Sequence, residues 1–354
     1  MAYTTINKST DHFNTKLYTG SGSAGHSITG VGFQPDWTWI KSRSGTHNSA
    51  NHRIYDAVRG VTKVIYSNLT NAEGTDAQGL TAFGTDGFTL GTENQSNGSS
   101  TEFVSWNWKA GGAGSSNSDG SITSTVSANT TAGFSIVKYT GNLTSNTYST
   151  VGHGLGSAPK MVIIKSMSDA EHWGVQHTGL SSQNMINLSS TGAQTDTSSS
   201  GTLSAPTSSV FSINYKGEWG NNGQEYIAYC FAEKTGYSKF GSYTGNGNAD
   251  GIFLYTGFKP SWVMIKNRST SNDWYLFDNS RDTLSPNNPV GRKSLYANTS
   301  GAEVTRTTKD MDFVSNGIKL RTADGSQNNN NENYIFMAFG QSLVGNNNVP
   351  CTAR

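Results

Sequence analysis

One short sequence frame occurs three times in the chain. It consists of Gly-x-x-Pro, then five residues rich in aromatic and β-branched types, then Lys. Its copies are 32–41 (GFQPDWTWIK), 156–165 (GSAPKMVIIK) and 257–266 (GFKPSWVMIK). Gly tolerates positive φ, and Pro fixes φ and has no N–H, so the first half of the frame marks a turn. The bulky residues that follow suit a pleated, half-buried surface, which predicts a strand after each turn.

Each frame is followed at a similar distance by a second aromatic strand. From the frame proline to the first aromatic residue of that strand there are 68, 67 and 74 residues, namely Pro35 to Phe103, Pro159 to Tyr226 and Pro260 to Tyr334. Such self-similarity indicates repeated units. Units of roughly 100 residues with several short strands between turns are typical of β-sandwiches, and they are long enough to bury a core each.

The sequence therefore predicts an all-β fold of three tandem antiparallel β-sandwich modules of jelly-roll or lectin-like type. We expect the modules at residues 1–110, 121–235 and 236–340. Residues 111–120 are rich in Gly and Ser and predict a flexible linker. Residues 341–354 are too polar for a core and predict a C-terminal tail that contacts another subunit.

Composition excludes several classes of protein. Hydrophobic residues make up 33% and charged residues 14%, but aromatic residues reach 11%, which distinguishes the chain from disordered sequences. The net charge of +1 gives no reason to expect binding to nucleic acid or to an anionic membrane. There is no apolar run of about 18 residues and no apolar leader, so we expect no membrane insertion and no signal peptide. Cys230 and Cys351 are expected to be inert thiols.

The residues predict no enzyme, no cofactor and no metal site. There is no Gly-x-Ser-x-Gly elbow, no Asp-x-Asp-x-Asp-Gly calcium loop, and no Gly-rich stretch that opens a helix. His172 and His177 are five residues apart, which in a strand places them on opposite faces. Glu171, Glu218 and Glu225 leave a carboxylate pair for glycoside hydrolysis open, although no spacing singles them out.

One loop is a candidate for binding carbohydrate. Trp219 lies in the polar stretch 216–223, close to Asn221 and Asn222. An exposed Trp can stack on a sugar ring while neighbouring amides bond its hydroxyls. The same Trp could instead contact a neighbouring subunit, because Trp is enriched at interfaces. We therefore predict Trp219, Asn221 and Asn222 as a carbohydrate-binding site, with subunit contact as the alternative.

Four stretches resemble a repeat module of virion proteins from tailed bacteriophages, many of them marine. They are TTINKSTDHF (4–13), VGFQPD (31–36), TTAGFSIV (130–137) and VGHGLG (151–156). The module is similar in outline to lectin-like, laminin-G-like sandwiches, and the resemblance covers nearly the whole chain. It implies a virion structural protein and supplies no catalytic residue.

The resemblance implies a virion location and two alternative roles. The first is a tail fibre or receptor-binding appendage that recognises host-surface glycans through its sandwich loops. The second is a capsid decoration or head-fibre protein with a purely structural role. The first module begins close to Met1, which favours a short appendage or a decoration over a long fibre. The expected partners are other virion subunits, a host glycan and copies of the chain itself, with a trimer implied by the resemblance.

Overall fold

The structure, a computed structural model, describes residues 4–282, 293–306 and 308–342. These residues form 28 strands, one four-residue helix α1 (Asn94–Asn97) and the 3-10 turns η1 (Ser9–Asp11) and η2 (Ser198–Ser200). Every ladder between the named strands is antiparallel. The predicted all-β, antiparallel fold class is therefore confirmed. Cys351 and most of the predicted tail lie outside the described residues.

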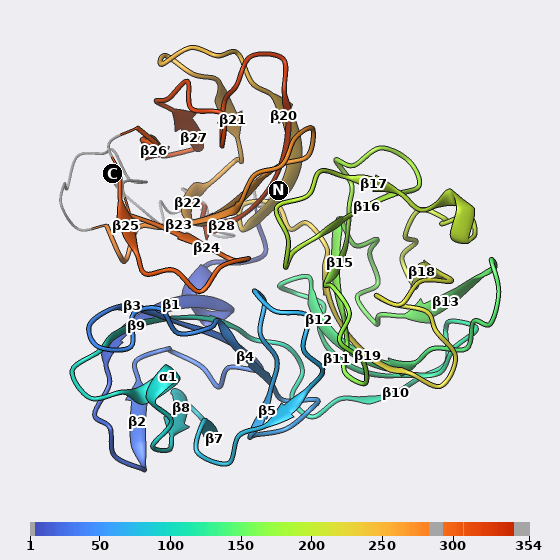
Figure 1. Cartoon of the computed structure of the whole chain (residues 1–354), viewed down its shortest axis with the longest axis horizontal. Coiled ribbons are helices and arrows are strands. Elements are labelled where there is room, and N and C mark those ends of the chain that lie inside the picture. Colours follow the sequence, from blue (N-terminus) through green and yellow to red (C-terminus); the bar gives the residue numbers. More distant parts are fainter. Residues whose placement is uncertain (1–3, 283–292, 307, 343–354) are drawn as a thin grey trace.

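The strands fall into three sets, which Figure 1 shows as three lobes around a common centre. The first lobe has a large sheet of β1 (Phe13–Thr19), β9 (Glu102–Trp108), β3 (Trp37–Ser44) and β4 (Arg53–Asp56), a small sheet of β2 (His26–Thr29), β8 (Gly87–Leu90) and β7 (Leu80–Gly84), and a ribbon of β5 (Lys63–Val64) and β6 (Gly74–Thr75). The second has a large sheet of β10 (Ser115–Asn117), β11 (Ser124–Asn129), β12 (Phe134–Thr140), β19 (Glu225–Phe231), β14 (Met161–Ser166), β15 (Gly174–His177), β16 (Asn184–Asn187) and β17 (Thr195–Asp196), and a small sheet of β13 (Tyr148–Gly152) and β18 (Val210–Asn214). The third has a large sheet of β20 (Ser238–Thr244), β28 (Asn333–Gln341), β22 (Lys259–Asn267), β23 (Trp274–Asp278), β24 (Lys293–Tyr296) and β25 (Val304–Thr305), and a small sheet of β21 (Phe253–Tyr255), β27 (Gly317–Leu320) and β26 (Met311–Val314).

Each lobe is a sandwich with a core of its own. In the first lobe, Ile28 and Phe88 of the small sheet pack with Ile40 and Phe103 of the large sheet. The second and third lobes contain corresponding clusters between their two sheets. Side chains alternate between the two faces of a strand, so each strand sends every second residue into this core. That the ranges 1–110, 121–235 and 236–340 would fold independently stays a prediction.

The predicted linker is partly a strand. Residues 115–117 form β10, which pairs along its whole length with β11 at the edge of the second lobe's large sheet. The prediction of a flexible linker at 111–120 is therefore wrong for these residues. The sequence misleads here because Ser115 and Ser116 are exposed, and an edge strand of this kind has no buried side chain to produce an apolar alternation.

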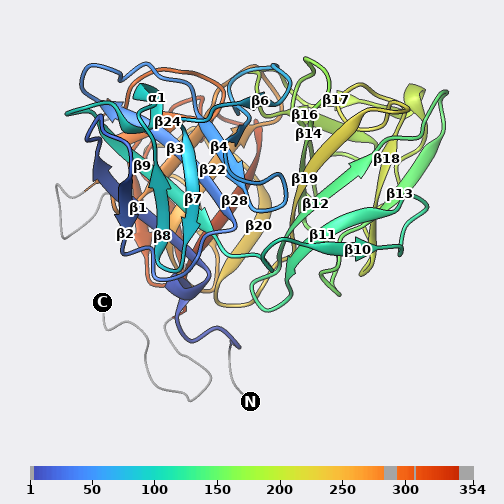
Figure 2. The same cartoon turned by 90° about the horizontal axis from the view of Figure 1, so that it is seen from below.

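The second faces of the three large sheets meet in one shared aromatic core. None of the described residues in this core belongs to a small sheet. Ring contacts join every pair of lobes across it: Trp37 and Tyr229 have centroids 4.5 Å apart, Trp108 and Trp262 5.6 Å, and Phe231 and Phe339 6.0 Å. Rings at these separations add attraction to the area they bury. Figure 2 shows the arrangement from the side, with the second lobe beside the other two.

Backbone hydrogen bonds close the three lobes into a ring. The acceptor in each case is the carbonyl two residues beyond the lysine of the frame. The bonds run from the N–H of Glu73 to Met167 (3.0 Å), from Gln194 to Arg268 (3.1 Å) and from Glu303 to Arg43 (3.0 Å). The first lobe thus donates to the second, the second to the third and the third to the first, which gives the lobes an approximate threefold arrangement.

Ring nitrogens form a second cyclic set of contacts at the same junctions. Nε2 of His52 lies 2.9 Å from the carbonyl oxygen of Tyr296, while the indole N–H of Trp173 donates to Tyr66 (2.9 Å) and that of Trp274 donates to Asn187 (2.9 Å). Each of these residues reaches a backbone carbonyl of the adjacent lobe. Buried carbonyls need such partners, so the polar contacts between lobes repeat along with the fold.

The lysine that ends each frame is buried at these junctions. Nζ of Lys41 donates to the carbonyl of Ser300 in the third lobe (3.0 Å), and Nζ of Lys266 donates to that of Thr191 in the second (3.0 Å). Lys165 is equally buried but donates to carbonyls of its own lobe. Burial lowers the pKa of Lys41 and Lys266 to about 7 and that of Lys165 to about 8.

The shared core predicts one cooperative unfolding transition for the three lobes. Trp37→Ala should lower the free energy of unfolding by about 3–5 kcal/mol, the usual cost of deleting a buried large aromatic side chain. Tyr148→Ala is the control, because Tyr148 is 55% exposed and lies away from this core. Urea unfolding followed by fluorescence and by circular dichroism measures both. Separate transitions for separate lobes would contradict the expectation.

The buried lysines predict that stability rises with pH above neutrality. An unfolded lysine has a pKa near ~10.4, so between about pH 7 and pH 9.5 the unfolded chain binds more protons than the folded one. The free energy of unfolding should therefore increase over this window. The test is to measure the free energy of unfolding at pH 7 and at pH 9.5, for wild type and for the double variant Lys41→Met/Lys266→Met. An equal increase in both proteins would show that these lysines are not its source.

Candidate functional site

The structure contradicts the predicted carbohydrate site. Trp219 has no exposed surface: its indole N–H donates to Oδ1 of Asn214 (2.8 Å), and its carbonyl accepts from the hydroxyl of Tyr139 (2.8 Å). A buried Trp can neither stack on a sugar nor contact a subunit, so both interpretations of Trp219 are wrong. Asn221 is half-buried and Asn222 is exposed. The loop is polar, but its one large apolar side chain gains most by burial in the second lobe's core.

His177 and His172 both have polar partners for their ring nitrogens within the chain. Nε2 of His177 lies 3.2 Å from the carbonyl oxygen of Phe336, and its Nδ1 accepts from the N–H of Gly179 (2.9 Å). Burial lowers the pKa of His177 to about 4, which keeps the ring neutral at pH 7. Nδ1 of His172 lies 2.9 Å from Oγ of Ser189. Across the described residues, no group of three or more His, Cys, Asp or Glu side chains is arranged to hold a metal ion.

Glu171, Glu218 and Glu225, which the sequence left open as a carboxylate pair, lie in different environments. Burial raises the pKa of Glu171, and repulsion from Glu218 adds to this effect. Glu225 instead forms an ion pair with Lys138 (3.0 Å) on the neighbouring strand. None of the three lines the cavity described below.

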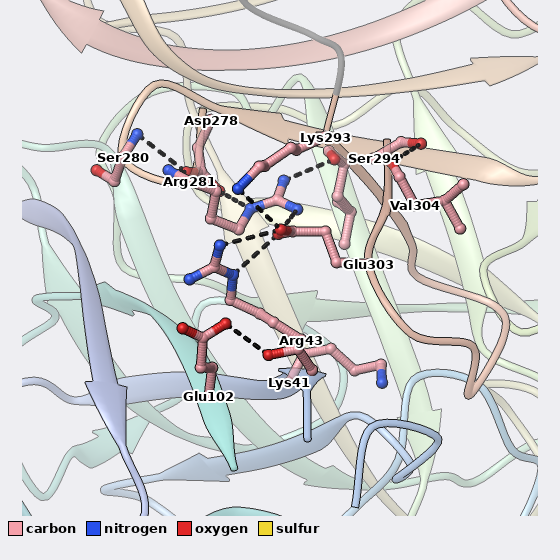
Figure 3. A network of polar contacts seen from close by, with 12 residues as sticks. Lys41, Arg43, Glu102, Asp278, Ser280, Arg281, Lys293, Ser294, Glu303 and Val304 are labelled. Carbon is pink, nitrogen blue, oxygen red and sulfur yellow. Dashed lines mark hydrogen bonds and ion pairs between the residues drawn. The ribbon is translucent and has the colours of Figure 1, made fainter. Parts of the chain in front are cut away.

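A dense cluster of charged side chains lies at the junction of the first and third lobes, as Figure 3 shows. Arg281 forms an ion pair with Asp278 (2.6 Å) and another with Glu303 (3.1 Å). Glu303 also pairs with Arg43 of the first lobe (2.9 Å). Burial alone would raise the pKa of Glu303, but the hydrogen bond from Arg43 and the charges of both arginines hold it below its ordinary value.

A related cluster is present in the first lobe. Arg59 pairs with Asp56 (2.5 Å) and with Glu73 (3.2 Å), and the hydroxyl of Tyr229 donates to Asp56 (2.7 Å). In the third lobe Asp278 similarly accepts from the indole of Trp106 (2.9 Å). In both clusters the arginine comes from the same lobe as the aspartate, whereas Tyr229 and Trp106 come from an adjacent lobe, so their hydrogen bonds join the lobes.

A cavity of about 440 Å³ in the second lobe is the better candidate for a ligand site. It lies where the small sheet of this lobe has only two strands, β13 and β18, whereas the other two lobes have a third strand, β7 or β26. Residues 203–206 occupy the corresponding place without forming a strand. Pro206 cannot donate to a ladder, and Leu203 is only partly buried, while Leu80 of β7 and Met311 of β26 are fully buried.

The lining of this cavity is almost uncharged. Its polar groups are amides, hydroxyls and one neutral imidazole, from Gln176, His177, Thr178, Ser181, Ser182, Gln183, Asn184 and Ser204. Its apolar groups come from Ala158, Pro159, Met161, Val162, Leu180, Leu203, Ala205 and Pro206. Lys160 is the single charged residue of the lining, which contains no carboxylate. Such a surface suits an uncharged, hydroxyl-bearing molecule with apolar faces, and it lacks the two carboxylates that cleave a glycosidic bond.

Gln183 fixes one wall of the cavity. Its side-chain amide donates to the carbonyl of Leu203 (2.7 Å) and accepts from the N–H of the same residue (2.6 Å). Its φ of 65° lies in the left-handed region. Thr62 occupies the corresponding position before β5 and has a φ of 67°, so this geometry belongs to a turn that the first and second lobes share and is not strain specific to the cavity.

These features define a three-lobed all-β protein with a shared core and a ligand-sized, nearly uncharged cavity in one lobe. The sequence matches the model of a family described as a domain of unknown function, DUF7483, over residues 8–342. The chain therefore belongs to the DUF7483 family. No curated protein matches the chain. None of the helices in the described residues is long and apolar enough to span a membrane.

The charged cluster between the lobes gives a prediction about stability. Glu303→Gln should lower the free energy of unfolding by about 3–5 kcal/mol at pH 7, because the buried Arg43 loses its carboxylate partner and Arg281 keeps only Asp278. The contribution of Glu303 is present above the unfolded pKa of about 4.3 and is lost as pH falls through the lower folded value. Acid unfolding should therefore be steeper in wild type. Asp11→Asn, at an exposed ion pair, is the control and should change little.

Proposed function

We propose that this chain is a non-enzymatic virion structural protein of a tailed bacteriophage, acting as a tail fibre or receptor-binding appendage that holds a host-surface glycan in the second-lobe cavity. The nearly uncharged lining of that cavity, in which Lys160 is the one charged residue, is the observation that carries the glycan assignment. The virion assignment rests on the sequence resemblance in the four stretches described above.

The cavity offers both kinds of contact that a saccharide needs. Amides and hydroxyls such as those of Asn184 and Ser182 match sugar hydroxyls, which donate and accept hydrogen bonds. Walls such as Leu180 and Leu203 match the C–H faces of a sugar ring. The two hydrogen bonds between Gln183 and Leu203 hold one wall of the cavity in place, which reduces the ordering free energy that opposes binding.

The second role, capsid decoration or head fibre, is supported by a different observation. Phe253 and Tyr255 of the third lobe are 46% and 59% exposed. Exposed aromatic side chains are typical of surfaces that contact other proteins. This role and the adhesive one share a virion location and differ in whether the cavity carries a function.

Filling the cavity tests the adhesive role. Ala205 is exposed and lines the cavity, so Ala205→Trp should obstruct it and weaken binding to host cells and to glycan arrays at least about tenfold. Ala24→Trp, in an exposed loop of the first lobe, is the matched control and should bind like wild type. Incubation with host polysaccharide should release no reducing ends.

The outcomes separate the two roles. If wild type binds neither cells nor glycans, the adhesive role fails and decoration remains. If Ala205→Trp binds as wild type does, a glycan is recognised elsewhere on the molecule. Release of reducing ends would contradict the non-enzymatic assignment.

A further inference from the structure

The outer face of the third lobe's small sheet differs from those of the other lobes. Phe253 and Tyr255 flank the inward-facing Leu254 on β21. In the first lobe the inward-facing residue of β2 is Ile28, which Ser27 and Thr29 flank. The two exposed rings therefore replace small polar residues at matching register positions.

The second lobe shows the same contrast. There Thr150 and Gly152 flank the inward-facing Val151 of β13. In the third lobe, two exposed aromatic rings occupy positions that hold small residues in the other two lobes. Exposed apolar patches mark sites of association, so these rings indicate a contact surface specific to the third lobe.

The backbone of β21 also has an open edge. Its ladder with β27 continues into the bonds from the N–H of Leu320 to the carbonyl of Ile252 (3.0 Å) and from the N–H of Thr256 to that of Asn316 (3.0 Å). Bonded residues alternate in an antiparallel ladder, so the N–H and C=O groups of Phe253 and Tyr255 point to the other side. Among the described residues, β21 pairs with no strand except β27.

The corresponding edge of the second lobe, that of β13, is covered by another part of the chain. The N–H of Ile122 donates to the carbonyl of Thr150 (3.0 Å), and Ile122 forms a bridge with Val151 of β13. A side chain at Gly152 would collide with Asn117 of the same covering segment. Another segment of the chain therefore covers this edge in the second lobe through one parallel bridge. A strand is the occupant that fits β21, because its alternating N–H and C=O groups match those of the open edge.

We propose that this occupant is β21 of a second copy of the chain, so that two third lobes join edge to edge about a twofold axis. Antiparallel pairing centred on Leu254 places Phe253 opposite Tyr255 of the second copy, and the reverse pair follows by symmetry. One contact then covers both rings of each copy and forms two cross-strand aromatic pairs.

The charges beside the strand permit this self-association. Asp250 pairs with Lys319 (2.9 Å) and with Arg321 (3.4 Å), and Arg321 pairs with Asp312 (2.7 Å). Both signs are present and already paired, so two such surfaces meet without an excess of like charge. A contact built on a three-residue strand is smaller than the roughly 1,000 Å² of a stable interface. The dimer is therefore weak, and it forms where many copies are held close together.

Cysteine crosslinking tests the pairing directly. In a Cys351→Ser background, which leaves only buried Cys230 of the native thiols, Phe253→Cys and Tyr255→Cys proteins are prepared separately. The proposed register puts position 253 of one copy about 5.5 Å, Cα to Cα, from position 255 of the other, a separation that a disulfide spans. Mixing the two proteins under mild oxidation should give several times more disulfide-linked dimer than either protein alone. Equal yields would overturn the proposal.

Sedimentation over a range of concentrations gives a second test. Wild type should show a reversible monomer–dimer equilibrium, and Phe253→Ser/Tyr255→Thr, which introduces the first lobe's own residues, should remain monomeric with an unchanged melting temperature. Wild type that stays monomeric at several hundred micromolar, a trimer, or a dimer unaffected by the double substitution would each overturn the proposal. Glycan binding is measured separately on Ala205→Trp, so the two proposals can fail independently.

Discussion

The burial of both faces of the large sheets is the constraint on which the rest of the structure depends. A sheet of a simple sandwich has one face on the core and one in water. Here all residues from Trp37 to Arg43 in β3 and from Met161 to Ser166 in β14 are buried, because the second face packs against the other two lobes. Each large sheet thus belongs to two cores at once, and a frame with bulky residues at consecutive positions is what such a strand requires.

Burial of both faces makes polar groups a problem, and the junctions solve it in a repeated way. Two of the three frame lysines, together with ring nitrogens and backbone amides, reach carbonyls across the junctions. Two acidic residues, Asp56 and Asp278, accept from the aromatic residues Tyr229 and Trp106 of adjacent lobes. At the corresponding position of the second lobe, His177 contacts the carbonyl of Phe336 instead. Among the described residues, the junction of the second and third lobes therefore has no arginine–carboxylate pair at this position.

The sequence allowed prediction of what depends on local pattern. Turns, strands and the all-β class follow from the frame and from alternation, and the closing strands follow from the repeated spacing. Contacts between residues far apart in the sequence could not be predicted from local pattern. Trp219 sits in a polar loop, and only the folded lobe shows that it points inward to Asn214. The frame lysine was visible as part of the motif, but its acceptor, Ser300 for Lys41, lies 259 residues away. The cavity arises from a missing strand, which can be seen only by comparing folded lobes.

The three lobes differ from one another in their small sheets. The shared core contains residues of the large sheets and none of the described small-sheet residues, and the small sheets lie toward the outside in Figure 1. A change in a small sheet therefore leaves the contacts between lobes intact. The two departures that bear on binding are both found there: the absent third strand beside the second lobe's cavity and the aromatic pair on β21. A fold that fixes its architecture with one set of sheets leaves the other set free to acquire different surfaces in each copy.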